Sequence, residues 1–274
     1  MQQVKEQTLI SAKLQEEPRV KQYYAMIAVV LVGLFLWSMS VIEVQPMSKE
    51  GSVIAKNIFK GILNPDWAFL FDFTQKGVPF LLLETISIAV LGTLVGAMIA
   101  VPLAFLSATN IVPKPVATVV RFIIMAIRTI PPFVYGLMFI RVTGPGASAG
   151  VLTLAVVSIG MISKMFTETI EDLDKGILES LEAAGCSLFQ KIRFGIIPQL
   201  KADFFSLLLY RFDMNLRDAT ILGLVGAGGI GAPLIFAMNA YKWTLVGAIL
   251  IGLFFLIFIV EAISSRIRTY LLKG

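Results

Sequence analysis

The sequence contains no histidine and one cysteine, and only 15% of its 274 residues are charged. Without histidine, the chain lacks the commonest proton-transfer group at neutral pH and the commonest metal ligand. The lone Cys186 excludes an intrachain disulfide and argues against a cysteine-rich metal site. These absences indicate a chain that is not an enzyme on its own and that holds no metal ion.

The residues that are abundant indicate a membrane protein. Apolar side chains make up 57% of the chain, and several apolar runs are long enough to cross a bilayer. The net charge of +5 is explained by cytoplasmic loops, so we expect no nucleic-acid partner. The expected fold class is all-α, a polytopic helical bundle in the lipid bilayer.

About six transmembrane helices are predicted. The first is 24–42, between a tail at 1–23 and an extracytoplasmic segment at 43–78. A core of five spans follows over 79–263, at 79–107, 117–140, 150–168, 203–225 with a broken continuation to about 240, and 243–263. The chain ends in a tail at 264–274. Within 43–78 the stretch 58–73 is amphipathic, and it lies along the membrane surface or forms an ordinary loop.

The orientation follows from the distribution of lysine and arginine. Both tails and the loops near 108–121 and 169–202 carry about twice as many cations as the other connections. We therefore predict a multi-pass protein of the plasma membrane with both termini in the cytoplasm.

Glycine and proline mark irregular positions inside the spans. Gly92 and Gly96 form a small-xxx-small pair that allows close helix contact. Pro131, followed by a second proline, is expected to kink the span 117–140. The stretch 224–233, "LVGAGGIGAP", predicts a break in the fifth span that either faces a solute pathway or allows close helix packing. Its central glycines are Gly226, Gly228 and Gly229.

Ionisable residues occur at membrane depth, where each costs several kcal/mol unless it is paired or hydrated. They are Arg128, Arg211, Asp213, Arg217 and Asp218. Ion pairing within 211–218 accounts for four of them. Alternatively, Arg128 or Arg217 presents a guanidinium to an anionic solute, because its planar fork matches phosphate-like oxyanions.

The polar segment 171–200 predicts a cytoplasmic helix-turn-helix. A helix is expected from about Asp174, with a bend at Gly185 and a second amphipathic helix that returns to the membrane near Pro198. A short projecting element of this kind suits a groove on a partner protein.

The same segment resembles the "EAA" loop of bacterial ABC-importer permeases. Glu179 precedes Gly185 by six residues, and Pro198 follows Gly185 by thirteen. The family pattern begins Glu-Ala-Ala, whereas this stretch begins Glu-Ser-Leu. The tripeptide Glu-Ala-Ala occurs here three residues later, from Glu182. The stretches "ETISIAVLGTLVGAMIAVPLAFLSA", "RTIPPFVYGLMF", "IRFGIIPQ" and "RDATILGLVGAGGIG" also resemble this family, the last three its phosphonate-type permeases in particular.

This resemblance implies a methionine-importer-like membrane domain that works as a homodimer. Its implied partners are two ATP-binding-cassette ATPase subunits, which hold ATP and Mg, and an extracytoplasmic substrate-binding protein. The implied function is import of phosphonates or related phosphorus oxyanions, such as phosphate and phosphite, across the bacterial plasma membrane. The ATPase-coupling residues would be Glu179, Glu182, Gly185 and Pro198. The solute pathway would include Arg128, Pro131 and Arg217 with the glycines of the broken span.

Other functions remain open from the sequence. The same machine could carry an amino acid or a quaternary amine, although the deep arginines favour an anion. A stand-alone channel or secondary transporter would need no cytoplasmic docking element. The chain contains no Gly-Lys dipeptide and thus no Walker A loop, so any ATP hydrolysis must occur on another subunit.

Overall fold

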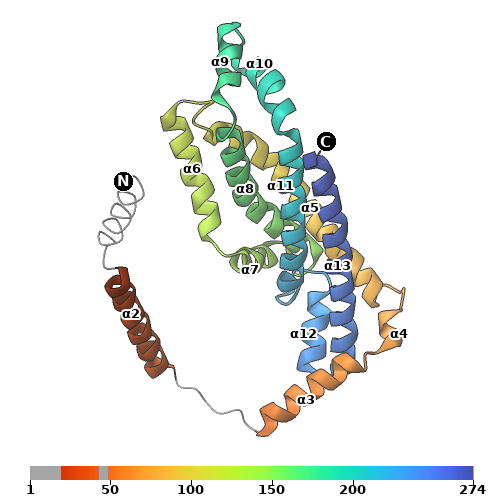
Figure 1. Cartoon of the computed structure of the whole chain (residues 1–274). Helices are drawn as coiled ribbons and strands as arrows, with labels where there is room; N and C mark the ends of the chain where they lie inside the picture. Colours follow the sequence, from red (N-terminus) through yellow and green to blue (C-terminus); the bar gives the residue numbers. More distant parts are fainter. Residues whose placement is uncertain (1–19, 43–48, 274) are drawn as a thin grey trace, which may run out of the picture. The chain divides into compact units, whose positions relative to one another are not determined.

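The computed structural model describes residues 20–42 and 49–273 (Figure 1). The chain divides into two compact units, Met1–Val53 and Ile54–Gly274. Every regular element in the described residues is helical, which confirms the all-α class.

The first unit contains α2, Val20–Val41. Its described side chains are exposed, and its apolar residues lie on all sides of the helix. A helix that is hydrophobic all round and 22 residues long is suited to crossing a bilayer. Most of the predicted tail at 1–23 lies outside the described residues.

The second unit is built around two long helices, α5 at Val78–Ser107 and α8 at Ala147–Glu171. Gly92 and Gly96 of α5 lie directly against α8. A Cβ at Gly92 would lie 2.5 Å from Leu154 Cβ, and one at Gly96 would lie 2.5 Å from Ser158 Cβ. The predicted contact role of this glycine pair is therefore confirmed.

Further helices follow along the chain in the described residues. They are α3 at Lys49–Leu63, α4 at Trp67–Leu70, α6 at Lys114–Thr129, α7 at Pro132–Thr143, α9 at Lys175–Ala183, α10 at Leu188–Gln190, α11 at Ile197–Gly223, α12 at Gly231–Asn239 and α13 at Trp243–Lys273. A π-helical stretch, η1, occupies Lys191–Ile196. Helix α6 packs against α8 and α5, whereas α11 packs against α5, α8 and α13.

The predicted kink is present as a sharp break between α6 and α7. The two helices are inclined by 82° across Ile130 and Pro131. Pro131 and Pro132 lack the N–H groups that would continue α6, and Pro132 begins α7 instead. The hydroxyl of Tyr135 donates to the carbonyl of Ile127 at 3.1 Å and ties the two sides of the break together.

Four described helices are long and apolar enough to cross a membrane: Gln22–Val41, Val78–Ser107, Ala147–Glu171 and Trp243–Leu271. The bent pair α6 and α7 raises this number to five if it forms one span. Helix α11 is not among them because charged residues, such as Arg211 and Arg217, interrupt its apolar sequence. The count of six stays a prediction.

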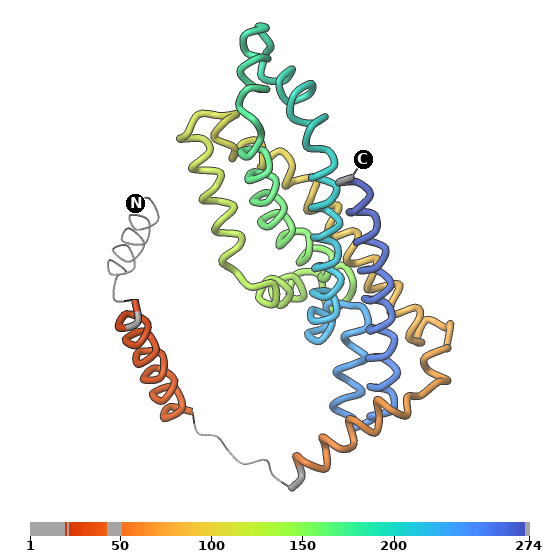
Figure 2. Tube along the Cα trace, viewed as in Figure 1, coloured from red at the N-terminus to blue at the C-terminus, as the bar shows by residue number. Residues whose placement is uncertain are grey.

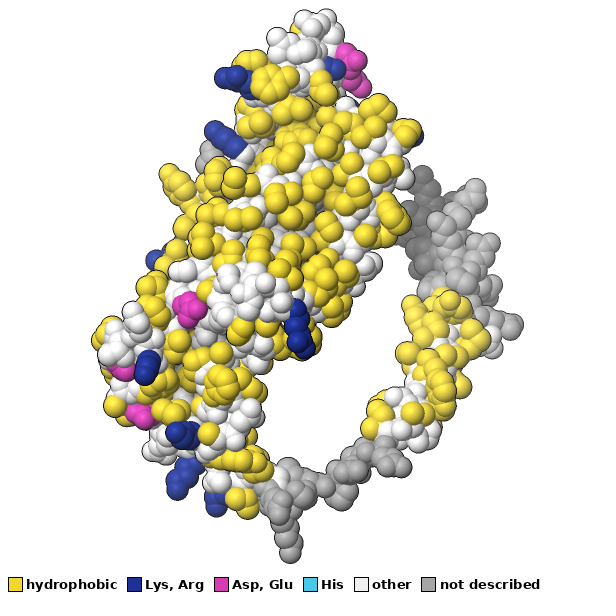
Figure 3. All heavy atoms as spheres, turned by 180° about the vertical axis from the view of Figure 1, so that it is seen from behind, with side chains coloured by type: hydrophobic (Ala, Val, Ile, Leu, Met, Phe, Trp, Pro, Cys, Tyr) yellow, Lys and Arg dark blue, Asp and Glu magenta, His cyan; other side chains and the backbone are white. Residues whose placement is uncertain are grey.

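The second unit presents a surface suited to lipid. Hydrophobic side chains cover most of the middle of the face in Figure 3, and charged side chains gather near α9 and α10 at one end and near α3 and α4 at the other. The Cα trace in Figure 2 shows α11 and α13 running side by side in opposite directions. Helices α9 and α10 project beyond the other helices at the end where α11 begins.

Candidate functional site

Charged side chains form two faces on α11. Helical spacing places Arg211, Asn215 and Asp218 on one face and Asp213 and Arg217 on another. The first face contacts α5 and α8, and the second contacts α13, as the hydrogen bonds described below establish.

The first face forms a buried polar network. Asn215 is fully buried, and its Nδ2 donates to Thr93 Oγ1 and to Ser158 Oγ, both at 2.8 Å. Arg211 Nε donates to the same Ser158 hydroxyl at 3.2 Å, and Arg211 Nη2 lies 3.6 Å from Asp218 Oδ2. These hydrogen bonds specify the register of α11 against α5 and α8, and they leave Arg211 Nη2 and Asn215 Oδ1 buried without a hydrogen-bond partner among the described residues.

The second face pairs with α13. Ser264 Oγ donates to Asp213 Oδ1 at 2.8 Å, and Arg268 Nη2 lies 3.6 Å from Asp213 Oδ2. Arg217 Nη2 donates to Glu261 Oε2 at 3.0 Å. The prediction that all four ionisable residues of α11 pair with one another is therefore wrong for Asp213 and Arg217. Their partners lie on the antiparallel helix α13.

The pair Arg217–Glu261 is exposed although Glu261 lies within the apolar helix Trp243–Leu271. The side chains are 49% and 58% exposed. Charges at membrane depth avoid lipid and turn to water or to protein. This face of α11 and α13 therefore suits a water-filled path or contact with another chain.

The glycine break after α11 is a packed turn. Gly226, Gly228 and Gly229 have φ values of +97°, +81° and +70°, which side chains rarely adopt. The N–H of Gly146 donates to the carbonyl of Gly226 at 2.9 Å, and the N–H of Ile230 donates to Thr85 Oγ1 at 3.0 Å. The break thus contacts the start of α8 and the first turns of α5.

Close packing explains two of the three glycines in this turn. A Cβ at Gly228 would lie 2.6 Å from the backbone nitrogen of Ala147, and one at Gly229 would lie 2.7 Å from Thr85 Oγ1. Gly226 is different, because its nearest neighbour would be Pro145 Cβ at 3.7 Å. Of the two alternatives left by the sequence, close packing accounts for Gly228 and Gly229, and a pathway role for the turn stays a prediction.

Arg128 and Pro131 lie at the end of α6 and the start of α7. Arg128 lines a pocket of about 280 Å³ between α6 and α8. Arg217, by contrast, lies against α13. The structure of this chain therefore does not bring Arg128 and Arg217 into one site.

The predicted helix-turn-helix is present at 171–200. Asp174 caps α9 by accepting from the N–H of Gly176 at 2.9 Å. The helix ends in a Schellman motif at Gly185, which has φ +76°: the N–H of Gly185 donates to the carbonyl of Glu182, and the N–H of Cys186 donates to that of Leu181. The sequence prediction of a bend at Gly185 is confirmed.

The second half of this segment was not fully predicted. Ser187 and Gln190 form a capping box at the start of α10, and the helix then widens into the π-helical stretch η1. Gly195 in η1 is buried against Leu181 of α9, where a Cβ would lie 2.5 Å from Leu181 Cδ1. The π-helical turn of η1 has no recognisable pattern in this sequence, so it could not be predicted.

The predicted coupling residues occupy different parts of this segment. Glu179 is exposed on α9, and Pro198 is in the first turn of α11. Glu182 Oε2 lies 3.2 Å from Lys191 Nζ, which links α9 to η1. Because Glu182 is 73% exposed, this pair contributes only about 0–1 kcal/mol to the stability of the fold.

The tip of the segment exposes apolar side chains among charged ones. Phe189 and Phe194 are 69% and 65% exposed, and Arg193 lies over the Phe194 ring at 5.7 Å. Exposed apolar residues rimmed by polar groups mark protein contact sites. This tip has the composition of a docking surface.

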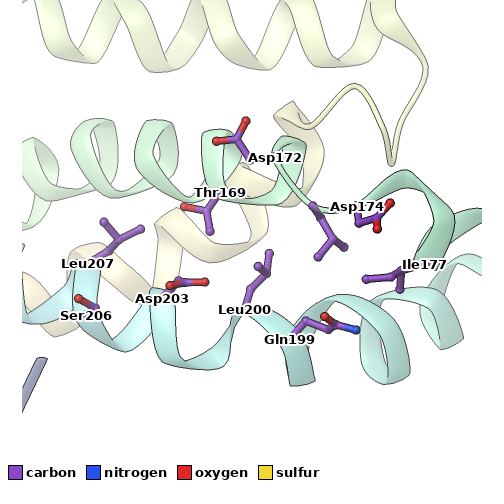
Figure 4. Close-up of a pocket in the computed structure, with 10 residues that line it drawn as sticks. Thr169, Asp172, Asp174, Ile177, Gln199, Leu200, Asp203, Ser206 and Leu207 are labelled. Carbon is purple, nitrogen blue, oxygen red and sulfur yellow. The ribbon is translucent and has the colours of Figure 1, made fainter. Parts of the chain in front are cut away.

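A pocket of about 490 Å³ lies beneath the tip, between the end of α8 and the start of α11 (Figure 4). Thr169 and Asp203 face each other across it, whereas the Asp172 carboxylate points away from α11. No group of three or more acidic or cysteine side chains among the described residues could hold a metal ion. The pocket is a gap at the base of the helix-turn-helix.

Comparisons with known proteins identify the family. The family described as "Binding-protein-dependent transport system inner membrane component" matches residues 100–273, more than half of the chain. The chain belongs to this family. It is therefore a multi-pass membrane component of a transport system, and the resemblance found in its motifs is confirmed.

Several members of the family are similar over most of the chain. The phosphite transport system permease PtxC of Stutzerimonas stutzeri is 34% identical over 69% of this chain and 69% of its own length. The transport system permease HtxC of the same organism is 32% identical over 97% of this chain and 93% of its own. The phosphate-import permease PhnE of Mycolicibacterium smegmatis is 37% identical over 71% of this chain but only 37% of its own length.

The fold is also similar to that of a solved transporter. The MetNI methionine ABC transporter, in an inward-facing conformation, superposes with a TM-score of 0.62 at 20% identity, over 71% of this chain and 95% of that one. At this identity the match establishes a shared fold, that of an ABC-importer membrane domain.

Proposed function

We propose that this chain is the membrane subunit of an ATP-driven ABC importer for phosphonates or related phosphorus oxyanions, such as phosphate and phosphite. The observation that carries the proposal is that PtxC and PhnE, which are 34% and 37% identical to it, are named for phosphite and phosphate transport. Arginine at membrane depth supports the same class of solute, because a guanidinium fork matches phosphate-like oxygens.

The assembly we propose contains two copies of this chain, two ATPase subunits and an extracytoplasmic binding protein. ATP and Mg bind to the ATPase subunits, and the chain itself is neither an enzyme nor a cofactor carrier. It lies in a bacterial plasma membrane with both termini in the cytoplasm. The segment 43–78 then lies outside, and the segment 171–200 reaches the ATPase.

The helix-turn-helix transmits motion from the ATPase to the spans. Its exposed tip docks into a groove on the ATPase, with Glu179 and Glu182 on the docking side. Gly185 holds the sharp turn, and Pro198 lies in the first turn of α11, which carries the charged faces. A displacement of the tip is thereby passed to the buried network at Asn215, which joins α11 to α5 and α8.

The solute path runs along the exposed charged face of α11, between the two copies. The guanidinium of Arg217 already forms an ion pair with Glu261, so it attracts an anion without binding it tightly. The bend at Pro131 and the cation Arg128 border the path at α6 and α7. The glycine turn borders it at the end of α11, through Gly226, Gly228 and Gly229.

Gentle purification of the chain from its native membrane, followed by identification of the proteins that accompany it, tests the proposed assembly. An ATPase in equal copy number supports the proposal, and a chain that transports alone without ATP contradicts it. Proteoliposomes of the intact complex with its binding protein then test the solute. We expect ATP-driven uptake of phosphite, phosphate or methylphosphonate, whereas uptake of methionine or glycine betaine instead would refute the proposed substrate class.

A further inference from the structure

A pocket between α6 and α8 gathers charges apart from the α11–α13 face. Its volume is about 280 Å³, and three cations, Arg121, Arg128 and Lys164, line it together with the carboxylates Glu168 and Glu171. The pocket carries a net charge of +1 when all five groups are ionised. A surplus cation in a lipid-facing helix bundle requires an explanation.

Two of the three cations already have partners. Arg121 Nη2 donates to Glu171 Oε1, and Arg121 Nε donates to the carbonyl of Ser107 at 2.9 Å. Lys164 Nζ lies 3.3 Å from Glu168 Oε1 one helical turn away. Glu171 also accepts from the backbone N–H of Thr109 at 2.6 Å. These contacts leave Arg128 as the cation of the pocket without a hydrogen bond or ion pair to any described residue.

The position of Arg128 is set by a glycine on the facing helix. Gly160 of α8 is buried, and a Cβ there would lie 2.7 Å from Arg128 Cγ and 3.2 Å from Ile127 Cγ2. The aliphatic part of Arg128 therefore packs against α8 in a space that only glycine leaves open. Packing of the stem holds the guanidinium at the pocket while its five N–H donors stay free.

We propose that this pocket binds a phosphoryl oxyanion, with Arg128 as its principal ligand. The guanidinium fork takes two phosphoryl oxygens, and the Lys164 ammonium supplies a second, point-like charge. Two sources offer this chemistry. One is the headgroup of an anionic phospholipid, whose acyl chains would lie along the exposed Phe122 and Met125 of α6. The other is a free phosphorus oxyanion, and this source alone rests on the proposed function.

The test uses the full-length chain in detergent, with two probes. Phosphatidylglycerol retained per chain is counted by native mass spectrometry, with phosphatidylcholine for comparison, and binding of radiolabelled inorganic phosphate is measured by equilibrium dialysis at low salt. Arg128→Gln is expected to lower binding of one or both phosphoryl probes about tenfold, the value of one charge-assisted contact. Arg128→Lys should restore part of it, because charge returns without the fork.

Two further variants keep the result interpretable. Arg141→Gln, which removes an exposed arginine in the last turn of α7, is the matched control for lost charge. Gly160→Ala retains every charge but displaces the Arg128 stem, so it should weaken binding severalfold even if Arg128→Gln assembles poorly.

The outcomes separate the two sources. A loss confined to phosphatidylglycerol assigns a lipid headgroup, and a loss of phosphate binding assigns a free oxyanion. Equal binding in Arg128→Gln and the unsubstituted chain, or an equal loss in Arg141→Gln, overturns the site. Uptake by the intact complex is scored separately, so a failure of the proposed transport function remains distinguishable from a failure of this pocket.

Discussion

Replacing Gly228 by alanine tests whether the glycine turn is held by contact with α8. Two costs are expected. Alanine at φ +81° is strained by about 1–2 kcal/mol. Its Cβ would also lie 2.6 Å from the nitrogen and 2.7 Å from the Cα of Ala147, which are backbone atoms that cannot rotate away. Overpacking of this kind typically costs about 1–3 kcal/mol.

Gly185 supplies a control for the backbone strain. Its φ is +76°, close to that of Gly228, and a Cβ there would meet nothing within 4 Å. Gly185→Ala therefore carries the strain of a left-handed residue without the collision. The difference between the two variants isolates the steric contribution, about 1–3 kcal/mol.

The assay is thermal unfolding of the purified chain in detergent, followed by the fluorescence of its three tryptophans. At roughly 2–4 °C per kcal/mol, Gly228→Ala should melt about 2–12 °C below Gly185→Ala. Equal Tm values for the two variants would refute the reasoning, since they would mean that the turn moves freely away from α8.

Three other predictions concern the coupling segment and the exposed ion pair. Gly185→Val should abolish uptake by the complex, while the chain still inserts and melts within a few degrees of the unsubstituted protein. No atom lies within 4 Å of the added Cβ, so the strain is local to the turn. Retained uptake would contradict a coupling role. Lys191→Gln should change the free energy of unfolding by less than about 1 kcal/mol, because its partner Glu182 is 73% exposed; a larger loss, seen in chemical denaturation, would show that the pair holds the two helices together. Arg217→Gln and Glu261→Gln should each destabilise the chain, and the double variant should be more stable than the sum of the two by about 1 kcal/mol; additive melting shifts in this cycle would mean that the two side chains act independently.

The long apolar helices and two of their special positions could be predicted from local sequence. Val78–Ser107 begins within one residue of the predicted span, because a continuous apolar run of this length has few alternatives in a membrane protein. The contact face at Gly92 and the break at Pro131 were equally accessible, since both depend on covalent properties of single residues.

Features that depend on contacts distant in sequence could not be predicted. Glu261 falls inside the predicted span 243–263 and Arg268 in the predicted tail 264–274. Only the packing of α13 beside α11 makes them partners of Arg217 and Asp213. Helix α13 continues to Lys273, ten residues beyond the predicted span, because a helix does not have to end where the apolar run ends.

The same limit applies to the predicted site residues. Arg128 and Arg217 looked alike in sequence, as arginines in apolar surroundings, but they contact α8 and α13, respectively. The free guanidinium of Arg128 depends on Gly160, a residue that sequence alone marks only as a small member of a span.

The exposed pair of Arg217 and Glu261 also bears on assembly. A solitary copy surrounded by acyl chains leaves this pair without water or protein to cover it, which costs free energy. A second chain or a water-filled path that covers the pair removes this cost, so the charges that suit a solute path also favour the associated state of the chain over the solitary one.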